Sequence, residues 1–92
     1  MPTISLFYGI AIRMFYNDHA PPHFHAVFAE YEAIISIKSG EIIKGNLPRH
    51  ARMLVLEWTK LYNDELLSNW ERGKKDVRQP FERIPGLDQE TH

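Results

Sequence analysis

The apolar residues of this chain change their spacing once, near Pro48, and that change limits the fold more than any other feature. Before it, apolar residues such as Ile10, Ile12 and Met14 stand at alternate positions, which predicts half-buried β-strands. After it, apolar residues recur every three or four positions, which predicts a long amphipathic helix. A strand region followed by a helical region within 92 residues predicts a single α+β domain.

The strand region predicts a four-stranded antiparallel meander, with strands at residues 10–16, 23–28, 31–38 and 41–44. Two prolines break the pattern after the first strand, and Ser39-Gly40 is a typical tight-turn pair. If residues 29–30 also form a two-residue loop, one face of the sheet is apolar and the other mostly polar. The pairs then expected are Phe28 with Tyr31, Ala26 with Ala33, Phe24 with Ile35, Val27 with Glu32, His25 with Ile34, His23 with Ser36, Ile37 with Ile42 and Lys38 with Glu41.

The helical region predicts one long C-terminal helix, packed on one face of the sheet. Asn46 would cap its start, Pro48 is tolerated in a first turn, and Gly73 would end it. We therefore expect the folded domain at residues 1–73. Residues 74–92 are polar and contain proline and glycine, so they predict an irregular tail that docks on the body or on a partner through Phe81, Ile84 and Leu87.

Composition excludes several classes of protein. There is no cysteine, which excludes disulfides, thiolate metal ligands and a cysteine nucleophile. Eleven basic against twelve acidic residues give a net charge of −1, which excludes a globally basic nucleic-acid binder but not a local basic patch. The first residues do not resemble a secretory signal, and there is no apolar run of membrane-spanning length, so we expect a soluble cytoplasmic protein.

The segment from Asp18 to His25 carries three of the five histidines. In a strand, His23 and His25 project from the same face and could chelate one divalent metal such as zinc, with His19 or Asp18 as a third ligand and Glu32 as a fourth. Two alternatives stay open. The histidines could be ordinary surface residues of the strand, or His19, His23 and His25 could act as general acid and base beside a phosphate-binding cation, Arg13.

Two further groups of residues are candidates for binding. Arg49 and Arg52 lie at the start of the predicted helix, where cations oppose the helix dipole; they would suit a phosphate, or they are simply exposed. Phe15 would stand on the polar face of the sheet with Arg13 and the histidines, where it would contact a partner or stack on a base.

The sequence resembles the small prokaryotic "domain of unknown function 4160" family over nearly its whole length. The residues that carry the resemblance are Met-Pro-Thr-Ile-Ser at 1–5, Phe7-Tyr8-Gly9-Ile10, Asp18-His19, Pro21-Pro22-His23-Phe24-His25-Ala26, Glu32-Ala33, Leu47-Pro48, Glu57-Trp58, Glu65-Leu66-Leu67 and Asn69-Trp70-Glu71. The resemblance implies no activity and no catalytic residue. It implies a gene beside that of another small protein, as in a toxin–antitoxin-like pair. The chain departs from the family pattern at Ala29, where we expect glycine in many members.

Three hypotheses follow. The first is a partner-binding component of a toxin–antitoxin-like two-protein module, whose partner is a small protein encoded nearby. The second is a small ribonuclease, metal-free or metal-assisted, that uses His19, His23 and His25 with Arg13 and with Arg49 or Arg52 on phosphate; RNA would be its ligand. The third is a metal-binding protein through His23 and His25. The free edges of the meander, or the tail, would also allow a homodimer.

Overall fold

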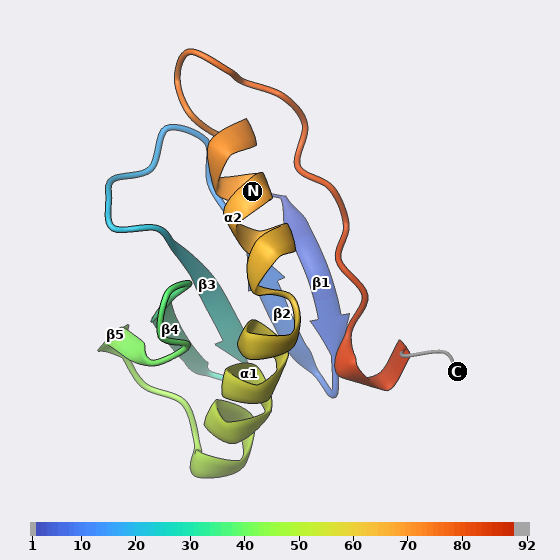
Figure 1. Cartoon of the computed structure of the whole chain (residues 1–92). Helices are drawn as coiled ribbons and strands as arrows, with labels where there is room; N and C mark the ends of the chain where they lie inside the picture. The colour runs from blue at the N-terminus through green and yellow to red at the C-terminus, as the bar shows by residue number, and fades with distance from the viewer. Residues whose placement is uncertain (1, 90–92) are drawn as a thin grey trace.

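Five antiparallel strands form one sheet in the computed structural model, which describes residues 2–89 (Figure 1). Each strand is hydrogen-bonded to the next along the chain, so the sheet is a meander, and the helices lie on one face of it. The elements are β1 (Thr3–Phe7), β2 (Ile10–Arg13), β3 (His23–Phe28), β4 (Tyr31–Ser36), β5 (Ile42–Gly45), α1 (Arg49–Leu61), α2 (Asn63–Arg72) and a short 3-10 helix, η1 (Leu87–Gln89). The α+β class predicted from the change in spacing is confirmed.

The prediction of four strands is wrong because it omits β1. This strand has a bulge between Thr3 and Ser5, and the neighbouring residues Ile4 and Ser5 are both buried. The alternation that predicts a strand is therefore interrupted within five residues. The turn from β1 to β2, Tyr8-Gly9, has a positive φ at both residues, which is the conformation of a tight type I′ hairpin.

The register predicted between β3 and β4 is confirmed for all six pairs, with residues 29–30 as the loop. Two strands are shorter than predicted: β2 ends at Arg13 instead of residue 16, and β4 ends at Ser36 instead of residue 38. The apolar face predicted by this register forms the core side of the sheet, since Phe24 and Ala26 are fully buried.

The register predicted for the hairpin after β4 is wrong. Ile42 pairs with Ile35 and not with Ile37, and β5 begins at Ile42 instead of residue 41. Ile37 is held elsewhere: its backbone N–H donates to the carbonyl of Pro22 at 3.1 Å, and its carbonyl accepts from the side chain of Asn63 at 2.6 Å. These contacts with distant segments widen the loop, and a turn signal in the local sequence cannot reveal them.

The single long helix predicted after Pro48 is also wrong. Two helices are present, and they meet at Tyr62, whose φ of −113° and ψ of 31° leave the helical region. The second helix begins at Asn63. The side-chain amide of Asn63 donates a hydrogen bond to the carbonyl of Ile37 in the loop after β4. The cap of α1 is Pro48 instead of Asn46, and α2 ends at Arg72 with Gly73 as its C-cap.

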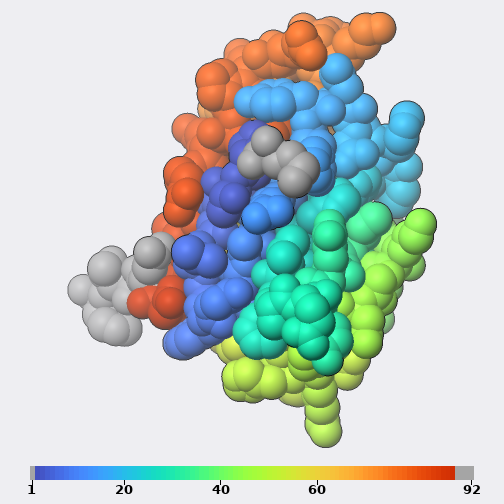
Figure 2. Space-filling model, turned by 180° about the vertical axis from the view of Figure 1, so that it is seen from behind, coloured from blue at the N-terminus to red at the C-terminus, as the bar shows by residue number. Residues whose placement is uncertain are grey.

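The core lies between the helices and the apolar face of the sheet. Trp58 of α1 is fully buried at its centre, with its ring centroid 5.2 Å from that of Phe7 and 5.7 Å from that of Phe24. The other face of the sheet carries no helix, and in Figure 2 the strands themselves form most of the surface seen from that side. Neither helix in the described part of the chain combines the length and apolar character needed to cross a membrane.

The segment after α2 runs back along the outer edge of β1 (Figure 1). The N–H of Ile84 donates to the carbonyl of Ile4 at 2.8 Å, and the indole N–H of Trp58 donates to the carbonyl of Pro85 at 2.8 Å. The buried side chain of Asn69 bonds to both the N–H and the carbonyl of Glu82, each at 2.8 Å. This segment therefore covers one edge of the sheet, while β5 is the opposite edge.

Candidate metal site

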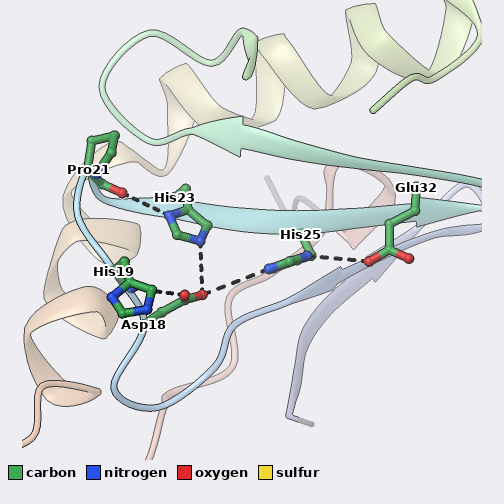
Figure 3. A network of polar contacts seen from close by, with 6 residues as sticks. All are labelled: Asp18, His19, Pro21, His23, His25 and Glu32. Carbon is green, nitrogen blue, oxygen red and sulfur yellow. Dashed lines mark hydrogen bonds and ion pairs between the residues drawn. The ribbon is translucent and has the colours of Figure 1, made fainter. Parts of the chain in front are cut away.

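The start of β3 and the loop before it bring Asp18, His23 and His25 together (Figure 3). His23 and His25 are two residues apart in β3, so both side chains project from the open face of the sheet. The Oδ1 atom of Asp18 accepts the backbone N–H of His19 at 2.9 Å, and its Oδ2 atom points toward both imidazoles. One nitrogen from each histidine and one oxygen of Asp18 all lie within 4.8 Å of one another.

The two ring nitrogens of His23 both face acceptors. Nδ1 lies 2.8 Å from the carbonyl oxygen of Pro21, and Nε2 lies 2.9 Å from Oδ2 of Asp18. A carbonyl can only accept, so Nδ1 carries a proton. In the neutral imidazole, Nε2 then carries a lone pair that points at a carboxylate oxygen of Asp18, and the two atoms repel each other. A proton or a metal ion between Nε2 and Oδ2 removes this conflict.

His25 has the same arrangement with looser distances. Its Nδ1 lies 3.4 Å from Oε2 of Glu32, and its Nε2 lies 3.9 Å from Oδ2 of Asp18. Both histidines thus direct Nε2 toward Asp18 and hold their outer nitrogen against an oxygen. Histidines that bind metals almost always donate their other N–H to a carboxylate or a backbone carbonyl, which fixes the tautomer and the ring orientation.

Aromatic rings shelter this group from solvent. The rings of Phe15 and His25 meet edge to face at a centroid distance of 4.5 Å, and the ring of Trp70 lies 5.2 Å from that of His23. The side chains of His23, His25 and Asp18 are 10%, 17% and 22% exposed. The three side chains of the group are therefore mostly, but not fully, removed from solvent.

Two hollows flank the group. One, of about 130 Å³, lies between the loop before β3 and the end of α2, and Asp18 and Trp70 both line it. The other, of about 270 Å³, lies on the open face of the sheet over β3, β4 and β5. Its lining residues are His25, Glu32, Ala33, Ile34, Lys44 and Gly45.

A family model described as "Domain of unknown function (DUF4160)" matches residues 9–71 of the chain. The chain belongs to this family. The match confirms the resemblance drawn from the sequence, and the region that it covers contains Asp18, His23 and His25. No curated protein and no solved structure matches the chain. The DUF4160 match assigns no reaction to the chain.

The structure brings some of the residues predicted for the site together. His23 and His25 lie in the group, and Arg13 stands directly opposite His25 in the β2–β3 ladder, on the same face of the sheet. Phe15 contacts His25, as expected from its place on the polar face. Among the described residues of this DUF4160 member, the third side chain of the group is that of Asp18 and not that of His19, which is exposed.

Arg49 and Arg52 are not part of this group. Both are exposed at the start of α1, and Figure 1 places the start of α1 at the opposite end of the molecule from the loop before β3. Arg52 instead lines a groove between β5 and α1. The combination of the histidines with these two arginines on one phosphate is therefore not supported by the arrangement of the elements.

Sequence reasoning missed two contributors. Trp70 belongs to the apolar stripe of the helical region, which predicts a place in the core, but its ring also contacts His23. The carbonyl of Pro21 orients His23, and a backbone oxygen carries no sequence signal. Glu32, the fourth ligand that the predicted register suggests, contacts the outer nitrogen of His25.

Proposed function

We propose that this DUF4160 protein binds a divalent transition metal, zinc first among them, through Asp18, His23 and His25. The observation that carries the proposal is the orientation of the two imidazoles. Both aim Nε2 at one carboxylate oxygen while Pro21 and Glu32 hold the outer nitrogens. A cation among the three inner atoms would satisfy all of them at once.

The donor set favours zinc. Imidazole and carboxylate are ordinary zinc ligands, and zinc sites that bind a substrate commonly have three protein ligands and keep a fourth position for water. When bound in such a site, zinc lowers the pKa of that water to about 7 and polarises oxygens of a bound substrate. Asp18, His23 and His25 would supply the three ligands. Glu32 would orient His25 and raise its basicity as a ligand.

A proton could occupy the same position between His23 and Asp18. In that case His23 is a doubly protonated imidazole paired with a carboxylate, and the group would serve acid–base chemistry without a metal. The two possibilities differ in one measurable respect. The metal hypothesis requires His25 as a ligand, whereas the proton needs only the 2.9 Å contact between His23 and Asp18.

A zinc titration against a chromogenic chelator tests the proposal. We expect one zinc per chain in the wild type. His23→Gln, His25→Gln and Asp18→Asn should each lower the affinity by about 100-fold or more, since each removes a ligand. Glu32→Ala should lower the zinc affinity by about tenfold, the smallest loss expected for a residue that orients a metal ligand. The loss is small because the contact between Glu32 and His25 is long and exposed.

The matched controls are His19→Gln and His50→Gln, which make the same change at exposed histidines outside the group. Both should leave zinc affinity unchanged. Absence of stoichiometric zinc binding would overturn the proposal. Equal losses in His19→Gln and His25→Gln would also overturn it, because zinc would then bind through scattered surface histidines.

Partner binding is the second candidate function, and the free edge at β5 favours it. Ile43 of β5 is 50% exposed, and the groove between β5 and α1 is lined in part by Met53, which is 56% exposed. A strand of a small partner protein, encoded nearby in a toxin–antitoxin-like pair, would add to this edge. Co-purification with the neighbouring gene product should be lost in Ile43→Lys. Failure to bind that product at micromolar concentration would contradict this candidate.

A further inference from the structure

One row of residues across the open face of the sheet combines the candidate metal site with two cations. The ladder pairs Arg13 of β2 with His25 of β3, His25 with Ile34 of β4, and Ile34 with Lys44 of β5. Residues directly opposite each other in a ladder project from the same face. Arg13 therefore lies one strand, about 5 Å, from His25, and Lys44 lies two strands, about 10 Å, on its other side.

Neither of these cations has a partner among residues 2–89. The side chains of Arg13 and Lys44 make no hydrogen bond or ion pair in that part of the chain, and the Nε atom of Arg13 is buried with no acceptor. A buried guanidinium N–H without an acceptor is costly, so it points to an acceptor that residues 2–89 do not provide.

Binding of a metal would leave the two positive charges of this face without compensating negative charges among the described residues. The carboxylates of Asp18 and Glu32 would balance a divalent metal ion, and the histidines would be neutral as ligands. The charges of Arg13 and Lys44 are then left over. A ligand with two negative charges would compensate both, and arginine forms paired hydrogen bonds to the oxygens of a phosphate group.

The hollow of about 270 Å³ beside His25 lies on this row. Its lining includes His25, the apolar side chain of Ile34 and the cation Lys44, so it offers an apolar wall and a positive charge next to the candidate metal site. The carboxylate of Glu32 also lines it and contacts the outer nitrogen of His25. The hollow beside Asp18 differs, because its lysine, Lys74, is already paired with Glu71 at 2.9 Å. The hollow beside Ile34 and Lys44 is therefore the better place for the outer part of an anionic ligand.

We propose that the open face binds a phosphate group of a small phosphate ester, held between the metal at Asp18, His23 and His25 and the guanidinium of Arg13, with Lys44 as the outer cation. This inference rests on the proposed metal site. Arg13 and Lys44 act here as binding residues that contact the ligand, and the ester portion would lie over Ile34 in the hollow.

Calorimetric titration of inorganic phosphate tests the inference, with the protein folded, zinc-loaded and at low salt. We expect saturable binding that requires zinc and that is stronger than binding of acetate, a singly charged anion. Arg13→Gln should weaken phosphate binding by about tenfold or more while zinc affinity is unchanged. Arg13→Lys, which keeps the charge and loses the paired hydrogen bonds, should show an intermediate loss, and Lys44→Gln a loss of severalfold.

Arg49→Gln is the control, because it removes an exposed arginine at the start of α1, which lies at the other end of the molecule. It should leave phosphate binding unchanged. Zinc binding without phosphate binding, or phosphate binding that Arg13→Gln does not weaken, would overturn this inference and leave the metal proposal intact. Absence of zinc binding would overturn the metal proposal and this inference with it.

Discussion

The Oδ2 atom of Asp18 is the point on which the candidate site converges, because both imidazoles aim Nε2 at it. The sequence predicted the histidine pair, since two residues at i and i+2 of a strand always share a face. It could not choose between Asp18 and His19 as the third member. That choice depends on the loop, where the N–H of His19 holds Oδ1 and turns Oδ2 toward β3.

Ala29 is a second residue whose role only the backbone reveals. It is the first residue of the β3–β4 loop, and its φ is +53°, in the left-handed region. That conformation costs a residue with a Cβ about 1–2 kcal/mol, whereas glycine adopts it freely. The expectation of glycine at this position in related sequences therefore has a physical basis in the turn.

Ala29→Gly should stabilise the protein. Relief of the left-handed strain outweighs the greater unfolded-state entropy of glycine, for a net gain of roughly 0.5–1 kcal/mol in the free energy of unfolding. Urea denaturation followed by circular dichroism measures it. Glu30→Gly is the matched control: Glu30 has no positive φ, so glycine there should destabilise by a few tenths to about 1 kcal/mol. A loss of stability in Ala29→Gly would contradict this account of the turn.

At the scale of elements, the sequence predicted the features that depend only on residues close together in the chain. The β3–β4 register followed from alternation and a two-residue loop, and all six predicted pairs are present. The break between α1 and α2 did not follow, because the apolar stripe continues through Tyr62. It depends on Asn63 reaching the carbonyl of Ile37, a contact between segments 26 residues apart. Likewise the bulge in β1 concealed a strand that only pairing with β2 defines.

The contact between α2 and the segment after it gives a prediction at the same scale. Asn69 is buried and bonds to both backbone groups of Glu82. Asn69→Ala would leave an N–H and a carbonyl without partners, so it should cost about 2–4 kcal/mol in the free energy of unfolding. Ser68→Ala, at an exposed neighbouring position, should cost less than about 0.5 kcal/mol. Equal, small effects in urea denaturation would mean that residues 80–89 do not dock through Asn69.

At the scale of the whole molecule, the sheet has two faces with different tasks. One face packs against the helices and supplies the core, and the other holds the histidines, a hollow and two cations that have no partner in the described part of the chain. The change in spacing near Pro48 predicted this division, because one amphipathic helical region can cover only one face of a sheet. The placement of Arg49 and Arg52 away from the histidines depends on how α1 lies across the sheet, which no spacing along the chain records.

The central claim is that Asp18, His23 and His25 hold a metal, and anomalous diffraction at the zinc absorption edge tests it most directly. Crystals of the untagged, zinc-loaded protein should show a peak about 2.0–2.2 Å from Nε2 of His23, Nε2 of His25 and Oδ2 of Asp18. A crystal without a peak there, in which Nε2 of His23 keeps its 2.9 Å contact with Asp18, would contradict the claim and assign that position to a proton.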